Sequence, residues 1–242
     1  MTDLKHLCFD KDGVIIDVHA YWVHTTKIRA NYLKNHFKLS ASQENDLVHI
    51  MGVDISLSKI RNNGPIGYEP REVIILQVVN QLLKYSIKVT FSELANLFVS
   101  IDEYQQKSKD YDIKLLKGVP EFLEKNKNKY VMSIFTSDRK KNAEMALEEF
   151  GIKKYFKEIL GGDSVSFPKP NPDGIYKACE KVGFKENETA YISDTSSDLI
   201  MAENAKVFLK IGVLTGLGHR NELIGNGDLI CKDFFELSNS LQ

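Results

Sequence analysis

Short apolar segments and amphipathic helical segments alternate along the second half of the chain. Residues 130–135 form a run of β-favouring side chains, and residues 139–150 carry apolar positions three or four apart before Gly151. Further strands are expected at 156–160, 190–192, 208–213 and 228–231, and further helices at 172–182, at 196–205 and at the C-terminal end. Strands separated by helices of about ten residues predict βαβ units and a parallel sheet, so the expected fold class is α/β.

The first half of the chain has a different pattern. Residues 4–9 are a short apolar run, but the following block has helical spacing almost throughout. This spacing is clearest at 20–37, 71–85 and 92–109. Ser92 and Glu93 are expected to open the last of these helices, and a loop is expected around Pro65.

This helical block is too long for an ordinary connection between two parallel strands. We therefore predict two domains. One domain combines residues 1–16 and 114–242 and contains the parallel sheet, and residues 17–113 form an inserted helical domain.

Charge and cysteine content limit the classes of partner. The 242 residues include 32 Lys and Arg against 33 Asp and Glu, a net charge of −1, which gives no electrostatic reason to expect nucleic acid or an anionic membrane. Three cysteines fit a reducing compartment better than a disulfide framework. No apolar run reaches about 18 residues, and Asp3 and Asp10 interrupt the start of the chain, where a signal peptide needs an apolar run. We therefore expect a cytoplasmic protein without a membrane span.

The first candidate for chemistry is a pair of carboxylates, Asp10 and Asp12, directly after the first apolar run. In an extended chain, positions two apart point to the same side. One carboxylate can then act as a nucleophile while its neighbour gives and takes a proton. The alternative is an ordinary turn at the end of a strand, before Gly13.

Two later segments could bind an anion. Thr136 and Ser137 follow the strand expected at 130–135, where a hydroxyl group and backbone N–H groups could hold an anionic oxygen. The alternative is a plain helix N-cap at Thr136, Ser137 or Asp138. Lys169 lies between two prolines just before a helix, where its ammonium group could offset the charge of carboxylates and of a phosphoryl group. Its alternative is an ordinary surface lysine.

A second pair of carboxylates, Asp194 and Asp198, lies four residues apart where a strand passes into a helix. Hard oxygen ligands of this kind suit Mg²⁺, which keeps several of its waters. The alternative makes Asp194 a helix N-cap and Asp198 a favourable charge in the first helical turn.

The order of these four segments resembles the haloacid dehalogenase superfamily, which consists mostly of Mg²⁺-dependent phosphatases. The family pattern is D-x-D-G-[VT], a hydroxyl residue after the second core strand, a lysine, and G-D-x-x-x-D. The resemblance runs from Leu4 to about Leu237 and departs from the pattern at Ser193, where the family usually has glycine. It implies a Rossmann-like parallel sheet core with an inserted all-helical cap domain, as in members similar to phosphoglycolate phosphatase and β-phosphoglucomutase.

The resemblance also implies roles for the matching residues. Asp10 would attack phosphorus and form an aspartyl phosphate, and Asp12 would act as general acid and then as general base. Thr136, Ser137 and Lys169 would hold the phosphoryl oxygens, which makes Lys169 part of the catalytic set with the two aspartates.

The same resemblance implies a Mg²⁺ ion as cofactor. Its ligands would be Asp10, the backbone carbonyl of Asp12, and Asp194, with Asp198 binding directly or through water. The expected partner is a small phosphorylated metabolite of the phosphoglycolate or sugar-phosphate type.

Other activities on the same fold are less favoured. Asp12 argues against a haloacid dehalogenase and against a phosphonatase, because those enzymes lack this second carboxylate. A phosphomutase of the β-phosphoglucomutase type stays open, although residues 51–55 lack the basic pair that its cap carries. A non-catalytic binding module is least favoured, because the carboxylates and the lysine are all present. Candidates for the substrate-facing side of the cap are His19, Trp22, His24, Arg29 and residues 61–63.

Overall fold

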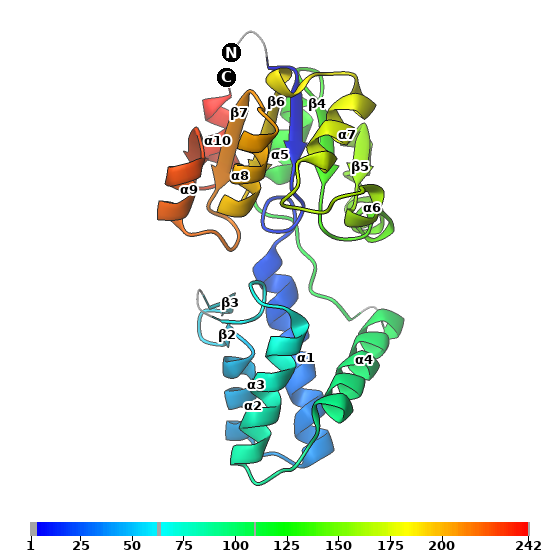
Figure 1. Cartoon of the computed structure of the whole chain (residues 1–242), viewed down its shortest axis with the longest axis vertical. Coiled ribbons are helices and arrows are strands. Elements are labelled where there is room, and N and C mark those ends of the chain that lie inside the picture. Colours follow the sequence, from blue (N-terminus) through cyan, green and yellow to red (C-terminus); the bar gives the residue numbers. More distant parts are fainter. Residues whose placement is uncertain (1–3, 62–63, 109, 242) are drawn as a thin grey trace. The chain divides into compact units, whose positions relative to one another are not determined.

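The computed structural model describes residues 4–61, 64–108 and 110–241. The chain divides into two compact units. The first unit combines Met1–Asp17 with Leu115–Gln242, and the second unit is Val18–Lys114. Figure 1 follows both units by sequence colour, and each is described separately here.

The first unit is built around a six-stranded parallel sheet with the strand order β5-β4-β1-β6-β7-β8. This order, with β1 at the centre, confirms the expected Rossmann-like α/β core. The strands are β1 (His6–Phe9), β4 (Val131–Phe135), β5 (Glu158–Leu160), β6 (Thr189–Ser193), β7 (Leu209–Val213) and β8 (Leu229–Cys231).

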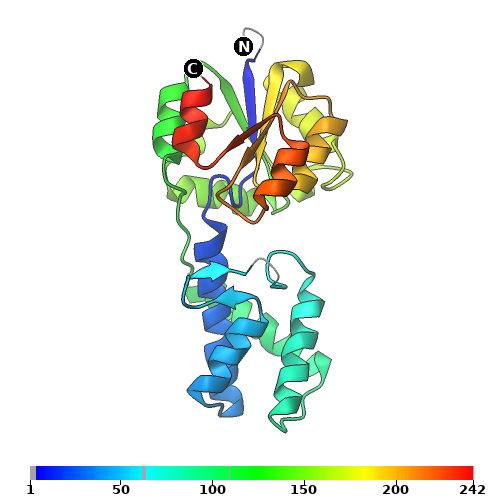
Figure 2. The same cartoon turned by 90° about the vertical axis from the view of Figure 1, so that its left-hand side faces the viewer.

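Helices cover both faces of this sheet, which explains why its strands are continuous apolar runs. Figure 2 shows α5 and α10 on one side of the sheet and α7, α8 and α9 on the other. The helices of this unit are α5 (Val119–Asn126), α6 (Lys140–Glu149), α7 (Asp173–Val182), α8 (Ser196–Asn204), α9 (Arg220–Asn226) and α10 (Phe234–Ser240).

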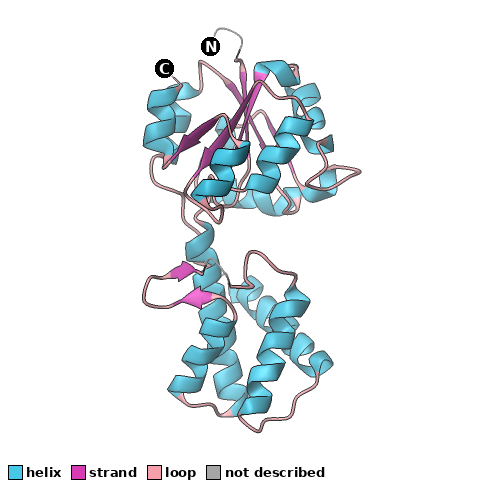
Figure 3. Cartoon of the chain, turned by 60° about the vertical axis from the view of Figure 1, so that its left-hand side comes forward, coloured by secondary structure: helices cyan, strands magenta, loops and turns pink. Residues whose placement is uncertain are grey.

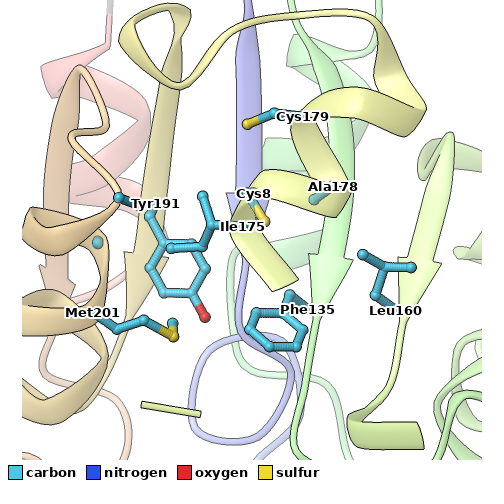
Figure 4. Packing of buried hydrophobic residues seen from close by; sticks show 10 residues of the cluster. Cys8, Phe135, Leu160, Ile175, Ala178, Cys179, Tyr191 and Met201 are labelled. Carbon is cyan, nitrogen blue, oxygen red and sulfur yellow. The ribbon is translucent and has the colours of Figure 1, made fainter. Parts of the chain in front are cut away.

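A buried cluster between the sheet and α7 and α8 supports the residues that follow the central strands. Figure 4 shows Phe135, Ile175 and Tyr191 in this cluster, together with Cys8 of β1. Helix α7 approaches the sheet closely at Gly174: a Cβ atom added there would lie 2.1 Å from the Phe135 ring. The close packing fixes the ends of β4 and β6, where the candidate residues begin.

The register of the sheet brings these strand ends together. Phe9 lies opposite Ile134 of β4 and Ile192 of β6, so three carboxyl ends are adjacent at the centre of the sheet. The N–H of Asp10 extends this pairing by donating to Ile192 O at 2.9 Å. In open parallel sheets this edge is where ligands bind.

The second unit is mainly helical, with α1 (Val18–Phe37), α2 (Ala41–Ile50), α3 (Arg71–Lys84) and α4 (Phe91–Ser108). Figure 3 also shows a small antiparallel ribbon in it, formed by β2 (Val53–Asp54) and β3 (Lys59–Ile60). The expectation of helices alone is corrected in this detail. The Asp54 carboxylate closes the turn of the ribbon by accepting from Ser56 Oγ at 2.6 Å and from Leu57 N at 3.1 Å.

The start of α4 also differs from the expectation. Thr90, rather than Ser92, caps the helix: its Oγ1 accepts from the N–H of Glu93 at 3.2 Å, and the Glu93 carboxylate accepts from the N–H of Thr90 at 2.8 Å. This is a reciprocal capping box, in which the glutamate acts from the third helical position. Lys109, at the expected end of the helix, lies outside the described residues.

The chain leaves and re-enters the first unit at neighbouring points. Ile16 and Leu115 form an antiparallel bridge, and the N–H of Leu116 donates to Ile15 O at 3.0 Å. The second unit is thus inserted between two paired segments. Among the residues that the structure describes, no helix combines the length and apolar character needed to cross a membrane.

Candidate active site

Lys169 joins two of the candidate carboxylates. Its Nζ donates to Asp10 Oδ1 at 2.8 Å and to Asp198 Oδ2 at 2.6 Å, and its side chain is only 9% exposed. The ammonium group also lies over the rings of Phe135 and Tyr191, at 5.1 and 5.6 Å from their centroids. This lysine is therefore a buried cation that holds the first and last aspartates, and the surface-lysine alternative is wrong.

Burial and neighbouring charges both act on the pKa values of Lys169 and Asp10. Burial alone would lower the pKa of Lys169, but Asp10 and Asp198 outweigh it and hold that pKa above its usual value. Burial raises the pKa of Asp10, and Asp198 and Asp12 raise it further against the opposing effect of Lys169. An ionised Asp10 therefore needs positive charge beside it.

Asp198 lies in the first turn of α8, and two further side chains orient its carboxylate. Ser193 Oγ donates to Asp198 Oδ2 at 3.0 Å, and the Tyr191 hydroxyl donates to the same atom at 3.3 Å. Sequence reasoning missed both partners. The one available signal was Ser193 itself, since a hydroxyl stands where the family pattern has glycine.

Asp194 is held by backbone rather than by side chains. Its Oδ2 accepts from the N–H of Leu217 at 2.7 Å. Added Cβ atoms at Gly13 and Gly216 would lie 2.4 and 1.9 Å from this oxygen, so the carboxylate occupies a space that only glycines leave open. The N-cap of α8 is Thr195, which rules out the N-cap alternative for Asp194.

Asp12 is paired with its own neighbour, a contact that the sequence analysis did not anticipate. Lys11 Nζ donates to Asp12 Oδ1 at 3.0 Å and lies 3.2 Å from Asp138 Oδ2. The Lys11 side chain is 8% exposed and that of Asp12 is 45% exposed. A buried ammonium group thus holds a carboxylate that is open to solvent.

Thr136 and Ser137 follow β4 but differ in exposure. Thr136 is buried, and its Oγ1 accepts from the N–H of Asp138 at 3.2 Å. Ser137 is exposed. The N-cap residue of α6 is Arg139, which uses no side-chain cap, so neither hydroxyl nor Asp138 caps that helix. Within the described residues, no hydrogen bond joins either hydroxyl to Asp10 or Lys169.

The charges at this edge of the sheet do not balance. When ionised, the carboxylates outnumber the two ammonium groups of Lys11 and Lys169 by three; they belong to Asp10, Asp12, Asp138, Asp194 and Asp198. Burial, with the nearby charge of Asp10, raises the pKa of Asp194 to about 8. Such an environment favours a bound cation, which would restore the charged form.

Side chains alone do not enclose an ion. Across residues 4–61, 64–108 and 110–241, no three His, Cys, Asp or Glu side chains are arranged to hold a metal. Mg²⁺ does not require such a cage, because it binds through one or two carboxylates and keeps several waters. Asp10 and Asp194, whose charges interact, would supply these oxygens, so the residues present fit a Mg²⁺ ion.

The candidates in the second unit have partners within that unit. The ring nitrogen His19 Nδ1 accepts from the N–H of Ile60 at 3.2 Å, and His24 Nε2 lies 2.8 Å from Asp110 Oδ1. Arg61 Nη1 donates to the carbonyl of His49 at 3.2 Å, and residues 62–63 lie outside the described residues. The histidines thus have structural contacts.

A pair of arginines, buried Arg29 and half-buried Arg71, involves the remaining candidates. Arg29 Nη2 donates to Asp102 Oδ1 at 3.1 Å, and Arg71 pairs with the other oxygen of the same carboxylate. Both guanidinium groups lie over the Phe98 ring, at 5.2 and 5.6 Å, and Arg29 also lies 5.8 Å from the Trp22 ring. Two cations here share one anion and stack on aromatic faces.

Comparison with known proteins gives the family. Residues 7–210 match the haloacid dehalogenase-like hydrolases, which covers most of the chain and every candidate residue of the sheet edge. The chain belongs to this family. The expected resemblance is thereby confirmed, and the chain is a hydrolase by family.

The chain is similar to phosphatases, in one case over nearly its whole length. A phosphoglycolate phosphatase from Haemophilus influenzae (strain 86-028NP) is 26% identical over 239 residues, covering 98% of this chain and 97% of its own. The probable phosphatase IndB from Dickeya dadantii is 36% identical over 94 residues, 39% of this chain and 40% of its own.

Solved structures show the same fold. A predicted phosphoglycolate phosphatase from Haemophilus somnus 129pt aligns over 100% of both chains with a TM-score of 0.71 and 22% identity. A candidate β-phosphoglucomutase from Thermotoga maritima aligns over 98% of both chains with a TM-score of 0.70 and 20% identity.

Proposed function

We propose that this chain is a Mg²⁺-dependent phosphatase that hydrolyses a small phosphorylated metabolite through an aspartyl phosphate. The coarser statement, that it is a phosphoric monoester hydrolase, follows from its family and from the phosphatases among its relatives. The observation that carries the proposal is the contact of buried Lys169 with Asp10 and Asp198 at the carboxyl end of β1.

In this proposal Asp10 is the nucleophile. Lys169 holds one of its oxygens and counters the effect of burial on its pKa, which favours the ionised and reactive form. The same ammonium group would offset the charge of the phosphoryl oxygens. Asp198, held by Ser193 and Tyr191, keeps the lysine in place.

Asp12 would handle the protons. It lies close enough to Asp10 for their charges to interact, and its carboxylate is exposed to solvent. It would protonate the leaving oxygen and then deprotonate the water that hydrolyses the aspartyl phosphate. Thr136 and Ser137 would add hydrogen bonds to the phosphoryl group, with backbone N–H groups of the loop after β4.

Asp10 and Asp194 would hold Mg²⁺, with the backbone carbonyl of Asp12 and with Asp198 directly or through water. The ion supplies positive charge that polarises the phosphoryl oxygens and relieves repulsion between them and the carboxylates. Gly13 and Gly216 leave the space that the Asp194 carboxylate occupies.

The substrate class follows from the relatives that span the full chain. We propose a small monophosphate of the phosphoglycolate or sugar-phosphate type, because phosphoglycolate phosphatases match this chain over nearly its whole length. In this reading the second unit, Val18–Lys114, is the cap domain that selects the substrate.

Asp10→Asn tests the nucleophile. The variant keeps the shape of the side chain and its contact with Lys169, so it should fold but lose turnover by about 10³-fold or more. Phosphate release across a panel of small phosphorylated metabolites measures the loss, and circular dichroism checks the fold. Asp228→Asn, an exposed residue just before β8 and therefore at the opposite end of the parallel sheet, is the matched control and should keep wild-type turnover. Mg²⁺-dependent activity retained in Asp10→Asn would exclude the assignment.

The same assay separates hydrolysis from phosphoryl transfer within a sugar. We expect one inorganic phosphate for each monophosphate consumed, with no requirement for a bisphosphate primer. Isomerisation of β-glucose 1-phosphate faster than phosphate release would show a phosphomutase instead.

A further inference from the structure

Lys11 is a buried cation that the proposed mechanism does not use. It lies in sequence between Asp10 and Asp12, and its side chain is as buried as that of Lys169. Buried lysines are rare unless they are paired. Its two partners are carboxylates from different loops: Asp12, after β1, and Asp138, after β4.

The loop after β4 fixes one side of this bridge. Asp138 Oδ1 accepts from the N–H of Arg139 at 2.7 Å and from Asn142 Nδ2 at 2.9 Å. The other oxygen, Asp138 Oδ2, faces Lys11 at 3.2 Å. The start of α6 therefore positions Asp138, and Asp138 in turn positions the ammonium group.

The other side of the bridge ends on an exposed carboxylate. Lys11 Nζ holds Asp12 Oδ1 at 3.0 Å, and the Asp12 side chain is 45% exposed. An exposed aspartate without such a contact would sample several rotamers. A carboxylate with one oxygen bound to an ammonium group carries its proton on the other oxygen, because an ammonium group only donates.

We propose that Lys11 is a positioning residue: anchored on Asp138, its ammonium group holds Asp12 Oδ1 and leaves Asp12 Oδ2 to carry the proton. This inference rests on the proposed phosphatase function. It adds to that function a bridge from α6 through Asp138 and Lys11 to Asp12. The bridge determines which Asp12 oxygen carries the proton and where that oxygen points.

The proton steps are as follows. As Asp10 bonds to phosphorus, the bond from phosphorus to the leaving oxygen breaks with its electron pair on oxygen, and that oxygen takes the proton from Asp12 Oδ2. A water oxygen then bonds to phosphorus, and its proton passes to Asp12 Oδ2. The bond from phosphorus to Asp10 breaks and returns the electron pair to the Asp10 carboxylate.

The test compares two leaving groups. An alkyl phosphate such as glycerol 2-phosphate needs protonation of its leaving oxygen, whereas 4-nitrophenyl phosphate needs it far less. Lys11→Met keeps the length of the side chain but removes its charge. We expect it to lower kcat/KM, which reports the first phosphoryl transfer, by about 30-fold or more for the alkyl phosphate and by less than about 5-fold for the aryl phosphate, because general acid catalysis contributes about 10²-fold or more. The later attack by water is common to both substrates, so a loss in that step lowers kcat for both alike.

Three further variants make the result specific. Lys11→Arg keeps a cation and should restore most of the alkyl rate. Asp138→Asn removes the anchoring charge and should shift the alkyl-to-aryl ratio in the same direction, so the proposal remains testable if Lys11→Met does not fold. Lys140, at the start of α6, pairs with Glu158 of β5 and serves as the matched lysine. Lys140→Met should leave the alkyl-to-aryl ratio unchanged.

The double variant Asp12→Asn/Lys11→Met should show the same ratio as Asp12→Asn alone, because Lys11 acts through Asp12. Equal losses of kcat/KM for both substrates in Lys11→Met, with KM unchanged, would overturn the proposal and show a merely structural bridge. An equal rise in KM for both would also overturn it and show direct phosphate binding. A wild-type protein that releases phosphate from neither substrate in Mg²⁺ would instead overturn the proposed function.

Discussion

At the carboxyl ends of β1, β4 and β6, buried carboxylates outnumber the ammonium groups beside them, whereas in the second unit two guanidinium groups share one carboxylate. The arginine cluster places its excess positive charge over the rings of Phe98 and Trp22. Among the described residues, the acidic cluster has two lysines and a few hydrogen-bond donors, but these leave its excess negative charge without a counter-charge. Packing against aromatic rings stabilises the positive excess, whereas the acidic excess is where the proposed Mg²⁺ ion would bind.

The largest expected effect follows from that uncompensated charge. Removal of divalent metal with EDTA should lower turnover by about 10³-fold or more, and Mg²⁺ should restore it. Without the cation, the negative charges of the carboxylates and of the substrate phosphoryl group repel each other. Ca²⁺ should restore little, since its looser and higher coordination misplaces the nucleophile.

Gly216→Ala sharpens this experiment. The new Cβ would occupy the place of Asp194 Oδ2, so the variant should lose both the activity and the rise in Tm that Mg²⁺ gives the wild type. Gly225→Ala, where a Cβ meets nothing within 4 Å, is the matched control. Full activity of the wild type in chelator would contradict the metal site.

His6 offers a third case, a buried polar residue that remains uncharged. Its ring nitrogens lie 3.0 Å from Thr189 Oγ1 and 2.7 Å from Ser133 Oγ, and burial, with a contribution from Lys157, lowers its pKa to about 4. Because the unfolded histidine binds protons from about pH 6.5, folding stability should fall as the pH drops from 6.5 toward 4.

The expected loss from this one group is about 3 kcal/mol over that range. His6→Gln keeps a hydrogen-bonding side chain that does not titrate. Urea unfolding of both proteins between pH 4 and 7.5 isolates the histidine, since Asp10 and Asp194 titrate in each. Parallel pH profiles for the two proteins would show that His6 does not carry this dependence.

The smallest effect compares the two clusters directly. Asp102→Asn removes the anion between two arginines and should lower the free energy of unfolding by about 2 kcal/mol, because it leaves the buried guanidinium group of Arg29 without its carboxylate. Asp194→Asn removes an anion from an acidic excess and should raise that free energy by at least about 1 kcal/mol. Opposite signs are therefore expected for the same chemical change.

Denaturation in chelator at pH 9 measures this difference, because Asp194 is then ionised above its raised pKa of about 8. Glu103→Gln, an exposed neighbour of Asp102 on α4, should change stability by less than about 0.5 kcal/mol. A loss of stability in Asp194→Asn would remove the contrast between the clusters.

The sequence predicted the core of this molecule well because strand ends and helix starts carry local signals. The apolar run before Asp10 and the helix after Pro172 each read correctly to within one or two residues, since periodicity and turn residues act over short distances. The ribbon at Val53–Ile60 was missed because two-residue strands have no periodicity to detect. The Thr90 cap was missed because Ser92 offers the same chemistry two positions later.

The candidate site was predicted in its residues but not in its contacts. Spacing could mark Asp12 and Lys169, but it gave no sign that Lys11 would turn inward between Asp12 and Asp138. That contact depends on the pairing of β1 with β4, residues more than a hundred positions apart. Tyr191 was read only as part of a strand, because its burial beside Asp198 is a property of the packed sheet.

The bridge between Ile16 and Leu115 has a consequence for how the chain folds. Pairing β1 with β4 through a disordered segment of about a hundred residues would cost about 4 kcal/mol in loop-closure entropy, apart from a constant. A second unit that has already folded, with both of its ends at this bridge, presents the strands to each other as if joined by a short turn. The folded insertion then holds β1 and β4 close to each other. Its length in residues therefore no longer slows the pairing of these two strands.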